Sequence, residues 1–215
     1  MRDGSSRIFD NSGSGIWPVR FSPDGRLVAA GNFNGEILIW ELRSGCLLAS
    51  LKGHSDTVSS IVFTPDGEGL INGDNDGILK YWDYTSARMS DEKGYGAADY
   101  WEHNEGLTFV GHTVGTFFCL MPILRFSPSQ DIIRSISISP DGQWIASGSK
   151  DDKTVRIWNT GTAVQQCILQ GHKLELFSVN FSPVGRYLAS ASSDGQVRIW
   201  TYNAGRRARE QQSSP

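Results

Sequence analysis

The sequence predicts an all-β protein made of repeated small sheets, and two periodic features support this fold class. Tryptophans recur at a fixed interval, since Trp40 and Trp82 are 42 residues apart and so are Trp158 and Trp200. A period of this length is typical of repeat architectures. Each of these tryptophans lies in a short stretch where apolar and polar residues alternate, as half-buried strands do; the stretches are EILIWE (36–41), GILKYWD (77–83), TVRIWN (154–159) and QVRIWT (196–201).

A Pro-Gly turn lies upstream of each tryptophan strand and sets the order of elements in the repeat. The turns are SPDG (22–25), TPDG (64–67), SPDG (139–142) and SPVG (182–185), and Gly-His pairs precede three of them at 53–54, 111–112 and 171–172. Each unit therefore runs strand, Pro-Gly turn, strand, tight turn and tryptophan strand, followed by a fourth strand such as CLLASLK (46–52). Four short strands in about 42 residues make one blade of a β-propeller. We therefore predict four blades of four-stranded antiparallel sheet.

The Gly-His pair, the Asp of the tight turn and the Trp-Asp end resemble the WD repeat, over roughly residues 16 to 203. In that family a His, a Ser or Thr, the turn Asp and the Trp form a buried hydrogen-bonded set, which suits buried polar groups because they need partners. Carried onto this sequence, the resemblance implies a structural network of His54, Asp76 and Trp82, of His112, Asp152 and Trp158, and of His172, Ser190, Asp194 and Trp200.

Three departures from the repeat pattern bear on this network. The second repeat has Asn72 where Ser is usual. The first repeat lacks the Gly-His pair and has Asn34 at the Asp position, so its network is expected to be incomplete. One extra residue in the third repeat leaves Asp151 as an alternative to Asp152.

The repeats divide the chain into a polar N-terminal segment (1–15), four units (16–52, 53–110, 111–170 and 171–203) and a polar basic tail (204–215). Insertions lengthen the second unit at 84–105 and the third at 114–130. Removing 114–130, which contains the apolar run FFCLMPIL, restores the third unit to the common register. We hypothesise that this segment is a translated intron; a genuine loop is the alternative.

WD-repeat propellers commonly have seven blades, so the resemblance implies an incomplete ring that lacks blades at its N-terminal end. In such rings the outer strand of the last blade is normally supplied by the N-terminus. SRIF (6–9) is the candidate for this strand.

Composition excludes several classes of function. The net charge of −3, from 20 basic and 23 acidic residues, gives no electrostatic case for direct nucleic-acid binding. Three widely spaced cysteines fit neither a disulfide framework nor a zinc site, which favours a reducing intracellular compartment. The N-terminus lacks an apolar signal region, and the longest apolar run (117–124) is too short to span a bilayer. We expect a soluble protein with no membrane partner.

Catalytic and metal-binding interpretations are weaker than structural ones. His54, His112 and His172 share one repeat position in different blades, so structural hydrogen bonding is favoured over metal ligation. The aspartates of the tight turns occupy positions where Asp bonds its own backbone. The turn glycines are not followed by the GK[ST] of a phosphate-binding loop, and no serine lies in a G-x-S-x-G elbow. We expect neither an enzyme nor a cofactor.

Longer segments resemble the last four blades of the fungal Tup/Groucho-type general transcriptional corepressor: FSPDGRLVAAG, FTPDGEGLINGDNDGILKYWD, a long loop, FVGH, DGQWIASGSKD and a terminal RIWTY. The resemblance implies a nuclear, non-catalytic scaffold that binds DNA-bound repressors and other corepressor subunits. A WD-repeat adaptor, such as a ubiquitin-ligase substrate receptor, and a truncated gene product remain alternatives. An open propeller edge would also favour self-association. On geometry, we expect the partner-binding face to include Trp17, Phe33, Asp56, Thr57, Asn75, Leu174, Glu175 and Ser193.

Overall fold

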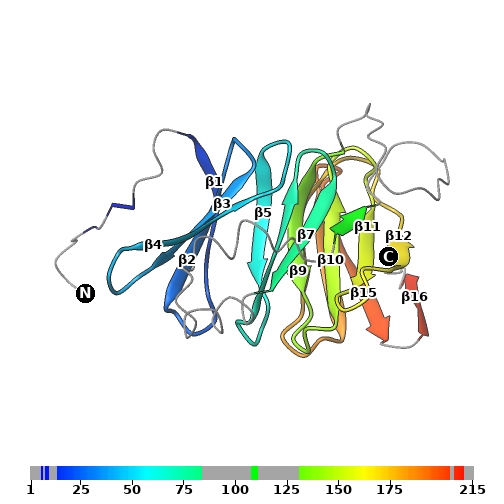
Figure 1. Cartoon of the computed structure of the whole chain (residues 1–215). Helices are drawn as coiled ribbons and strands as arrows, with labels where there is room; N and C mark the ends of the chain where they lie inside the picture. Colours follow the sequence, from blue (N-terminus) through cyan, green and yellow to red (C-terminus); the bar gives the residue numbers. More distant parts are fainter. Residues whose placement is uncertain are drawn as a thin grey trace.

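Sixteen strands form four antiparallel sheets in the described part of the computed structural model, which comprises residues 6, 8–9, 14–83, 108–110, 131–203 and 206–210. The sheets stand side by side, with the first and last at opposite ends of the row (Figure 1). Each sheet has four strands in chain order. The predicted all-β fold of four propeller blades is therefore confirmed.

The four blades use the strands in sequence. Blade 1 contains β1 (Ile16–Phe21), β2 (Leu27–Asn32), β3 (Glu36–Glu41) and β4 (Leu47–Lys52), and blade 2 contains β5 (Val58–Phe63), β6 (Gly69–Asp74), β7 (Ile78–Asp83) and β8 (Thr108–Val110). Blade 3 contains β9 (Ile133–Ile138), β10 (Trp144–Ser149), β11 (Val155–Asn159) and β12 (Gln165–Leu169), and blade 4 contains β13 (Leu176–Phe181), β14 (Tyr187–Ser192), β15 (Val197–Asn203) and β16 (Arg206–Glu210).

The Pro-Gly turns close the first hairpin of each blade through side-chain bonds. In blade 1 the Ser22 hydroxyl donates to Asp24 Oδ1 at 2.6 Å and accepts the Leu27 amide at 2.9 Å. Gly25 has a φ of 67°, in the left-handed region that glycine adopts without steric cost. In blade 4 Val184 replaces the Asp of this motif, and the Ser182 hydroxyl still accepts the Tyr187 amide at 3.1 Å.

The core lies between adjacent blades. We call the face that a blade turns towards the next blade its leading face, and the opposite one its trailing face. On the leading face of blade 1, buried Ile37 and Ile39 pack with Val58 and Ile61 of the innermost strand of blade 2. The same arrangement recurs between blades 2 and 3 and between blades 3 and 4. Packing between blades, rather than within one sheet, therefore supplies the hydrophobic core.

A glycine on each of these leading faces lets the blades approach closely. A Cβ built at Gly31 would lie 2.4 Å from Cγ1 of Val58, and one at Gly73 would lie 2.9 Å from Cγ2 of Ile133. Gly148 of blade 3 would similarly meet Val179 at 2.9 Å. The absence of a side chain at these three glycines thus allows the short distance between neighbouring blades.

The end of the chain differs from the expected polar tail. Residues Arg206–Glu210 form β16, which pairs with β15 through Trp200↔Glu210 and Thr201↔Arg209. The fourth strand of blade 4 therefore comes from the segment that follows β15, and not from the N-terminus as expected. A single hairpin supplies this strand locally, so the blade needs no distant segment. The insertions at 84–105 and 114–130 lie outside the described residues.

Candidate functional site

Blade 4 contains a complete hydrogen-bonded network of the kind that the resemblance implied. His172 Nδ1 lies 3.0 Å from Asp194 Oδ2, and His172 Nε2 lies 2.8 Å from Ser190 Oγ. The Trp200 indole N–H donates to the same hydroxyl at 2.8 Å. These distances are satisfied together when Nδ1 carries the histidine proton, so that the Ser190 hydroxyl donates to Nε2 and accepts from the indole. The network ties the Gly-His loop to β14 and β15.

The Asp194 carboxylate is held ionised by this network. Burial raises the pKa of Asp194, but hydrogen bonds from the Lys173 amide, from His172 and from the Gln196 amide outweigh it, and the pKa lies well below its usual range. The Lys173 and Gln196 amides donate at 2.9 and 3.0 Å. A carboxylate with this many donors acts as a local anchor for backbone rather than as a proton-transfer group.

Blade 2 uses a different acid from the one predicted. His54 Nδ1 lies 2.6 Å from Asp74 Oδ2, and both side chains are fully buried. Asp76, the predicted partner, instead accepts the Ser55 hydroxyl at 2.7 Å. Asp74 is the last residue of β6 and its other oxygen accepts the amides of Asp76 and Ile78. The assignment of Asp76 was wrong because the buried Asp74, at the end of β6, pairs with His54, whereas Asp76 lies in the turn after β6 and bonds Ser55.

The tryptophan of blade 2 is held by the unusual Asn72. The Trp82 indole donates to Asn72 Oδ1 at 2.8 Å. His54 Nε2 and Asn72 Nδ2 are buried and make no hydrogen bond with the described residues. An amide in place of a hydroxyl therefore holds the indole but does not reach the histidine, so the network of blade 2 is split into two pairs.

In blade 3 the tryptophan and the predicted turn acid bond to different partners. The Trp158 indole donates to Ser147 Oγ at 2.8 Å, while His112 lies outside the described residues. Asp152, predicted as the turn acid, accepts the Thr154 amide at 2.8 Å and pairs with Arg156 at 2.9 Å. The buried carboxylate here is Asp131, which accepts the Ser149 hydroxyl.

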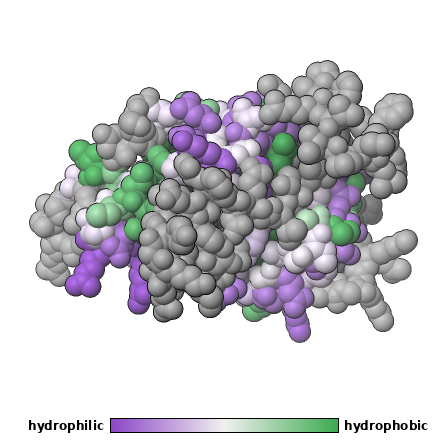
Figure 2. All heavy atoms as spheres, viewed as in Figure 1, coloured by the Kyte–Doolittle hydropathy of each residue, from purple (hydrophilic) through white to green (hydrophobic). Residues whose placement is uncertain are grey.

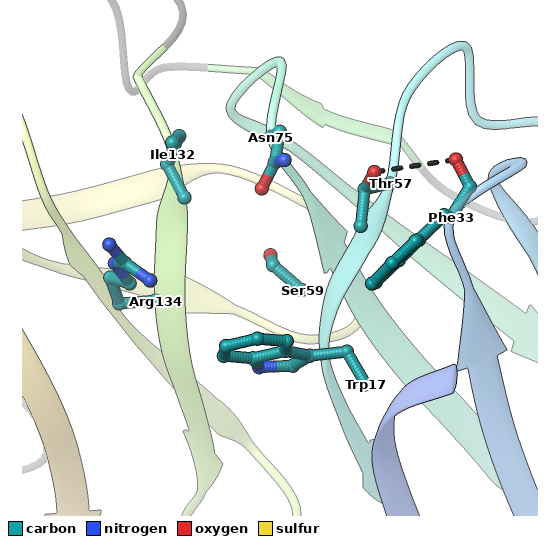
Figure 3. Close-up of a pocket in the computed structure, with 7 residues that line it drawn as sticks. All are labelled: Trp17, Phe33, Thr57, Ser59, Asn75, Ile132 and Arg134. Atoms are coloured by element: carbon teal, nitrogen blue, oxygen red, sulfur yellow. Dashed lines mark hydrogen bonds between the residues drawn. The ribbon is translucent and has the colours of Figure 1, made fainter. Parts of the chain in front are cut away.

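A hollow of about 330 Å³ opens where the first three blades meet. Figure 3 shows that Trp17 and Phe33 come to it from blade 1, and that Ile132 and Arg134 come from the segment leading into β9 and from β9 itself. The remaining lining residues belong to blade 2, namely Thr57, Ser59 and Asn75. Four of the eight residues predicted for the partner-binding face therefore line this hollow.

Both aromatic residues of the hollow are accessible, because Trp17 is 65% exposed and Phe33 is 51% exposed. Their loops are held by backbone bonds: the Phe33 amide donates to the Gly15 carbonyl at 3.0 Å, and the Thr57 hydroxyl donates to the Phe33 carbonyl at 3.3 Å. The aromatic rings are therefore presented on an ordered framework, which lowers the entropic cost of binding a partner.

Arg134 supplies the cationic group of the hollow. Its Nε is buried and has no hydrogen-bond partner among the residues that the structure describes. The residue as a whole is only partly buried and lines the hollow, so its guanidinium, rather than the buried Nε alone, would meet an incoming carboxylate or carbonyl oxygen.

The sequence interpretation missed Ser59, Ile132 and Arg134, although the repeat register would have found them. Trp17, Ser59 and Arg134 occupy the same position on the innermost strands β1, β5 and β9, one residue after the first apolar residue of the strand, which is Ile16, Val58 or Ile133. Thr57 and Ile132 likewise share the position just before β5 and β9. The insertion at 114–130 hid this equivalence in the third repeat.

The other predicted face residues lie outside the hollow. Leu174, Glu175 and Ser193 belong to blade 4, where the Ser193 amide donates to the Glu175 carbonyl at 3.0 Å and Leu174 is exposed. Asp56 lies beside Thr57 but does not line the hollow. The predicted face therefore contains one concave part, at blades 1 to 3, and separate loops on blade 4.

Within the described ranges, no three His, Cys, Asp or Glu side chains come together in a way that would hold a metal ion. In the same part of the chain there is no helix long and apolar enough to cross a membrane.

The fold, the repeated Gly-His and tryptophan positions and the hydrogen-bonded network define a WD-repeat propeller. The family model "WD domain, G-beta repeat" matches residues 3–41, 45–83, 120–159 and 163–201, so the chain belongs to the WD40 family.

Relatives in this family have diverse names. The chain is 30% identical over 195 residues to the periodic tryptophan protein 2 homolog of Dictyostelium discoideum, covering 82% of this chain and 20% of the relative. It is 27% identical over 196 residues to nuclear distribution protein PAC1 of Coccidioides posadasii, covering 85% and 37%. It is 41% identical over 86 residues to transcriptional repressor rco-1 of Neurospora crassa, covering 38% and 14%. The chain thus spans less than two fifths of the length of each of these relatives.

Proposed function

We propose that this chain is a non-catalytic scaffold of a transcriptional corepressor, and that the hollow at blades 1 to 3 binds peptide segments of DNA-bound repressors. The observation that carries this proposal is the pair of accessible aromatic rings, Trp17 and Phe33, in a hollow that the guanidinium of Arg134 also lines. Aromatic residues and arginine are enriched where protein interfaces concentrate their binding energy.

The chemistry of the hollow favours one kind of segment. Trp17, Phe33 and Ile132 offer an apolar surface for an aliphatic or aromatic side chain. Arg134 offers its guanidinium to a carboxylate, and Asn75 adds an amide that both donates and accepts. We infer that the preferred peptide carries a large apolar residue close to an Asp or Glu.

The corepressor role rests on the match to the transcriptional repressor of Neurospora crassa and on the segments that resemble the Tup/Groucho-type family. The name of this repressor concerns transcription, which favours the nucleus as the site of action. The protein partners are then sequence-specific repressors and other corepressor subunits, without direct contact to DNA.

An array of peptides taken from sequence-specific repressors tests this proposal. We expect the 215-residue chain to retain peptides that combine an apolar residue with an acidic one. Trp17→Ala should reduce binding at least tenfold, and Arg134→Glu should reverse the preference for acidic peptides. Val184→Ala, a change at an exposed turn far along the chain, serves as the control. Equal binding by all variants would refute the hollow as the binding site.

An adaptor role, such as a ubiquitin-ligase substrate receptor, would use the same hollow. The two roles separate in a reporter assay in which the chain is fused to a heterologous DNA-binding domain. A corepressor lowers transcription of the reporter, whereas an adaptor of a ligase leaves it unchanged and lowers the abundance of the bound peptide fused to a reporter protein.

A further inference from the structure

The leading face of blade 4 repeats the positions that form the interfaces between the other blades, but here they are exposed. Val197 and Ile199 are 70% and 50% exposed. They occupy the positions of Ile37 and Ile39 in blade 1, which are 0% and 1% exposed because blade 2 covers them. In blade 3 the equivalent Val155 and Ile157 are likewise buried under blade 4. Blade 4 therefore presents a sheet face shaped to receive the innermost strand of another blade.

The innermost strand of blade 1 presents part of the other half of this interface, whereas Val28, Leu38 and Trp40 on the same trailing face are already buried. Ile16 and Val19 of β1 are 40% and 45% exposed. They hold the positions of Val58 and Ile61, which are fully buried against blade 1. The same positions are filled by Ile133 and Ile136 in blade 3 and by Leu176 and Val179 in blade 4. Hydrophobic side chains also reach the surface over the end of the row that blade 1 forms (Figure 2).

We propose that two copies of this chain associate head to tail, with Ile16 and Val19 of one copy packing on Val197 and Ile199 of the other. The occupant is a second copy because one chain carries both halves of an interface that it already uses three times internally. Such a contact is heterologous, and it closes into a ring when the rotation per copy is half a turn. Two copies of four blades then form eight blades, within the size range of known propellers. This inference does not depend on the proposed function.

Two features make the contact between copies looser than the internal ones. Ala191 of blade 4 stands where the leading faces of the other blades have Gly31, Gly73 and Gly148, so its Cβ holds the incoming strand further away. Phe9 packs on Trp40 of blade 1, with ring centroids 5.9 Å apart, on the face that an incoming blade would cover. We therefore expect reversible association that depends on concentration.

Sedimentation equilibrium over a concentration series tests the proposal with the full chain. The wild type is expected to reach the mass of a dimer at high concentration. Val197→Glu and Val19→Glu should each raise the dissociation constant of the dimer at least thirtyfold. Both positions are exposed, so neither change should disturb the folded chain. Val184→Glu is the matched control, because Val184 is 75% exposed in a turn of blade 4 away from the leading face. Ala191→Gly should tighten association.

A mixture of the two variants distinguishes head-to-tail from face-to-face contact. The Val197→Glu variant keeps an unchanged blade 1, and the Val19→Glu variant keeps an unchanged blade 4. In a mixture, these two unchanged blades can pack on each other and form one wild-type interface. The mixture should therefore associate where each variant alone does not. The proposal is overturned by a wild type that stays monomeric, by association that both variants leave unchanged, or by a mixture that fails to associate.

Discussion

Removal of the Ser190 hydroxyl is the sharpest test of the network in blade 4. The Oγ of Ser190 bonds both His172 Nε2 and the Trp200 indole, each at 2.8 Å, and all three residues are buried. Ser190→Ala leaves two buried polar groups without a partner. Each such group costs about 1–3 kcal/mol, so we expect the free energy of unfolding to fall by about 2–6 kcal/mol.

Thermal unfolding followed by circular dichroism measures this loss. For a domain of this size a loss of about 3 kcal/mol lowers the Tm by roughly 6–12 °C. Ser193→Ala makes the same chemical change in the same blade at an exposed hydroxyl, which makes only a long bond of 3.4 Å to the Glu175 carbonyl, and it should lower the Tm by less than about 2 °C. If Ser190→Ala and Ser193→Ala have equal Tm values, the hydroxyl does not stabilise the fold and the reasoning is refuted.

Three further predictions concern packing, pH and thiol reactivity. Gly31→Ala places a Cβ 2.4 Å from Cγ1 of Val58, and the overpacking should cost about 1–3 kcal/mol in urea unfolding; unchanged stability would contradict the steric argument. The lowered pKa of Asp194 means that its contribution to stability is present above the unfolded-state pKa of about 3.9 and is lost as the pH falls below it. The acid unfolding of Asp194→Asn should therefore be less steep below about pH 4 than that of the wild type, and identical profiles would disprove the coupling. Burial raises the pKa of the Cys167 thiol, so peptide mapping after brief alkylation of the folded chain should find it labelled more slowly than exposed Cys46; the reverse order would contradict this.

The repeated features of the fold could be predicted because the same sequence pattern recurs in each of the four repeats. The spacing of Trp40, Trp82, Trp158 and Trp200 and the Pro-Gly turns locate three strands of every blade. β16 was missed because RRARE shows no alternation of apolar and polar residues. A strand that completes the outer edge of a sheet needs backbone pairing rather than an apolar face.

The candidate site was predicted in part for a similar reason. Trp17, Phe33, Thr57 and Asn75 lie at loop positions that the strand boundaries define. Arg134 follows an insertion that displaces the third repeat, so its equivalence to Trp17 appears only once the repeats are aligned without that insertion. The choice of Asp74 over Asp76 depends on which carboxylate turns beneath His54, and the sequence offers two acids at suitable spacing.

The completion of blade 4 by β16 has a consequence for how the protein opens. Each of the four sheets consists of consecutive strands from one stretch of the chain. Neighbouring blades therefore contact each other through side chains and do not exchange strands. In such a stack, the free energy of locally unfolding one blade depends mainly on its contacts with the adjacent blades. Among the described strands, blades 2 and 3 pack against a blade on each side, whereas blades 1 and 4 pack against one. Amide hydrogens should therefore exchange fastest in β15 and β3 and slowest in β6 and β10. When a second copy of the chain packs on blades 1 and 4, the exchange rates of the four blades should become more similar.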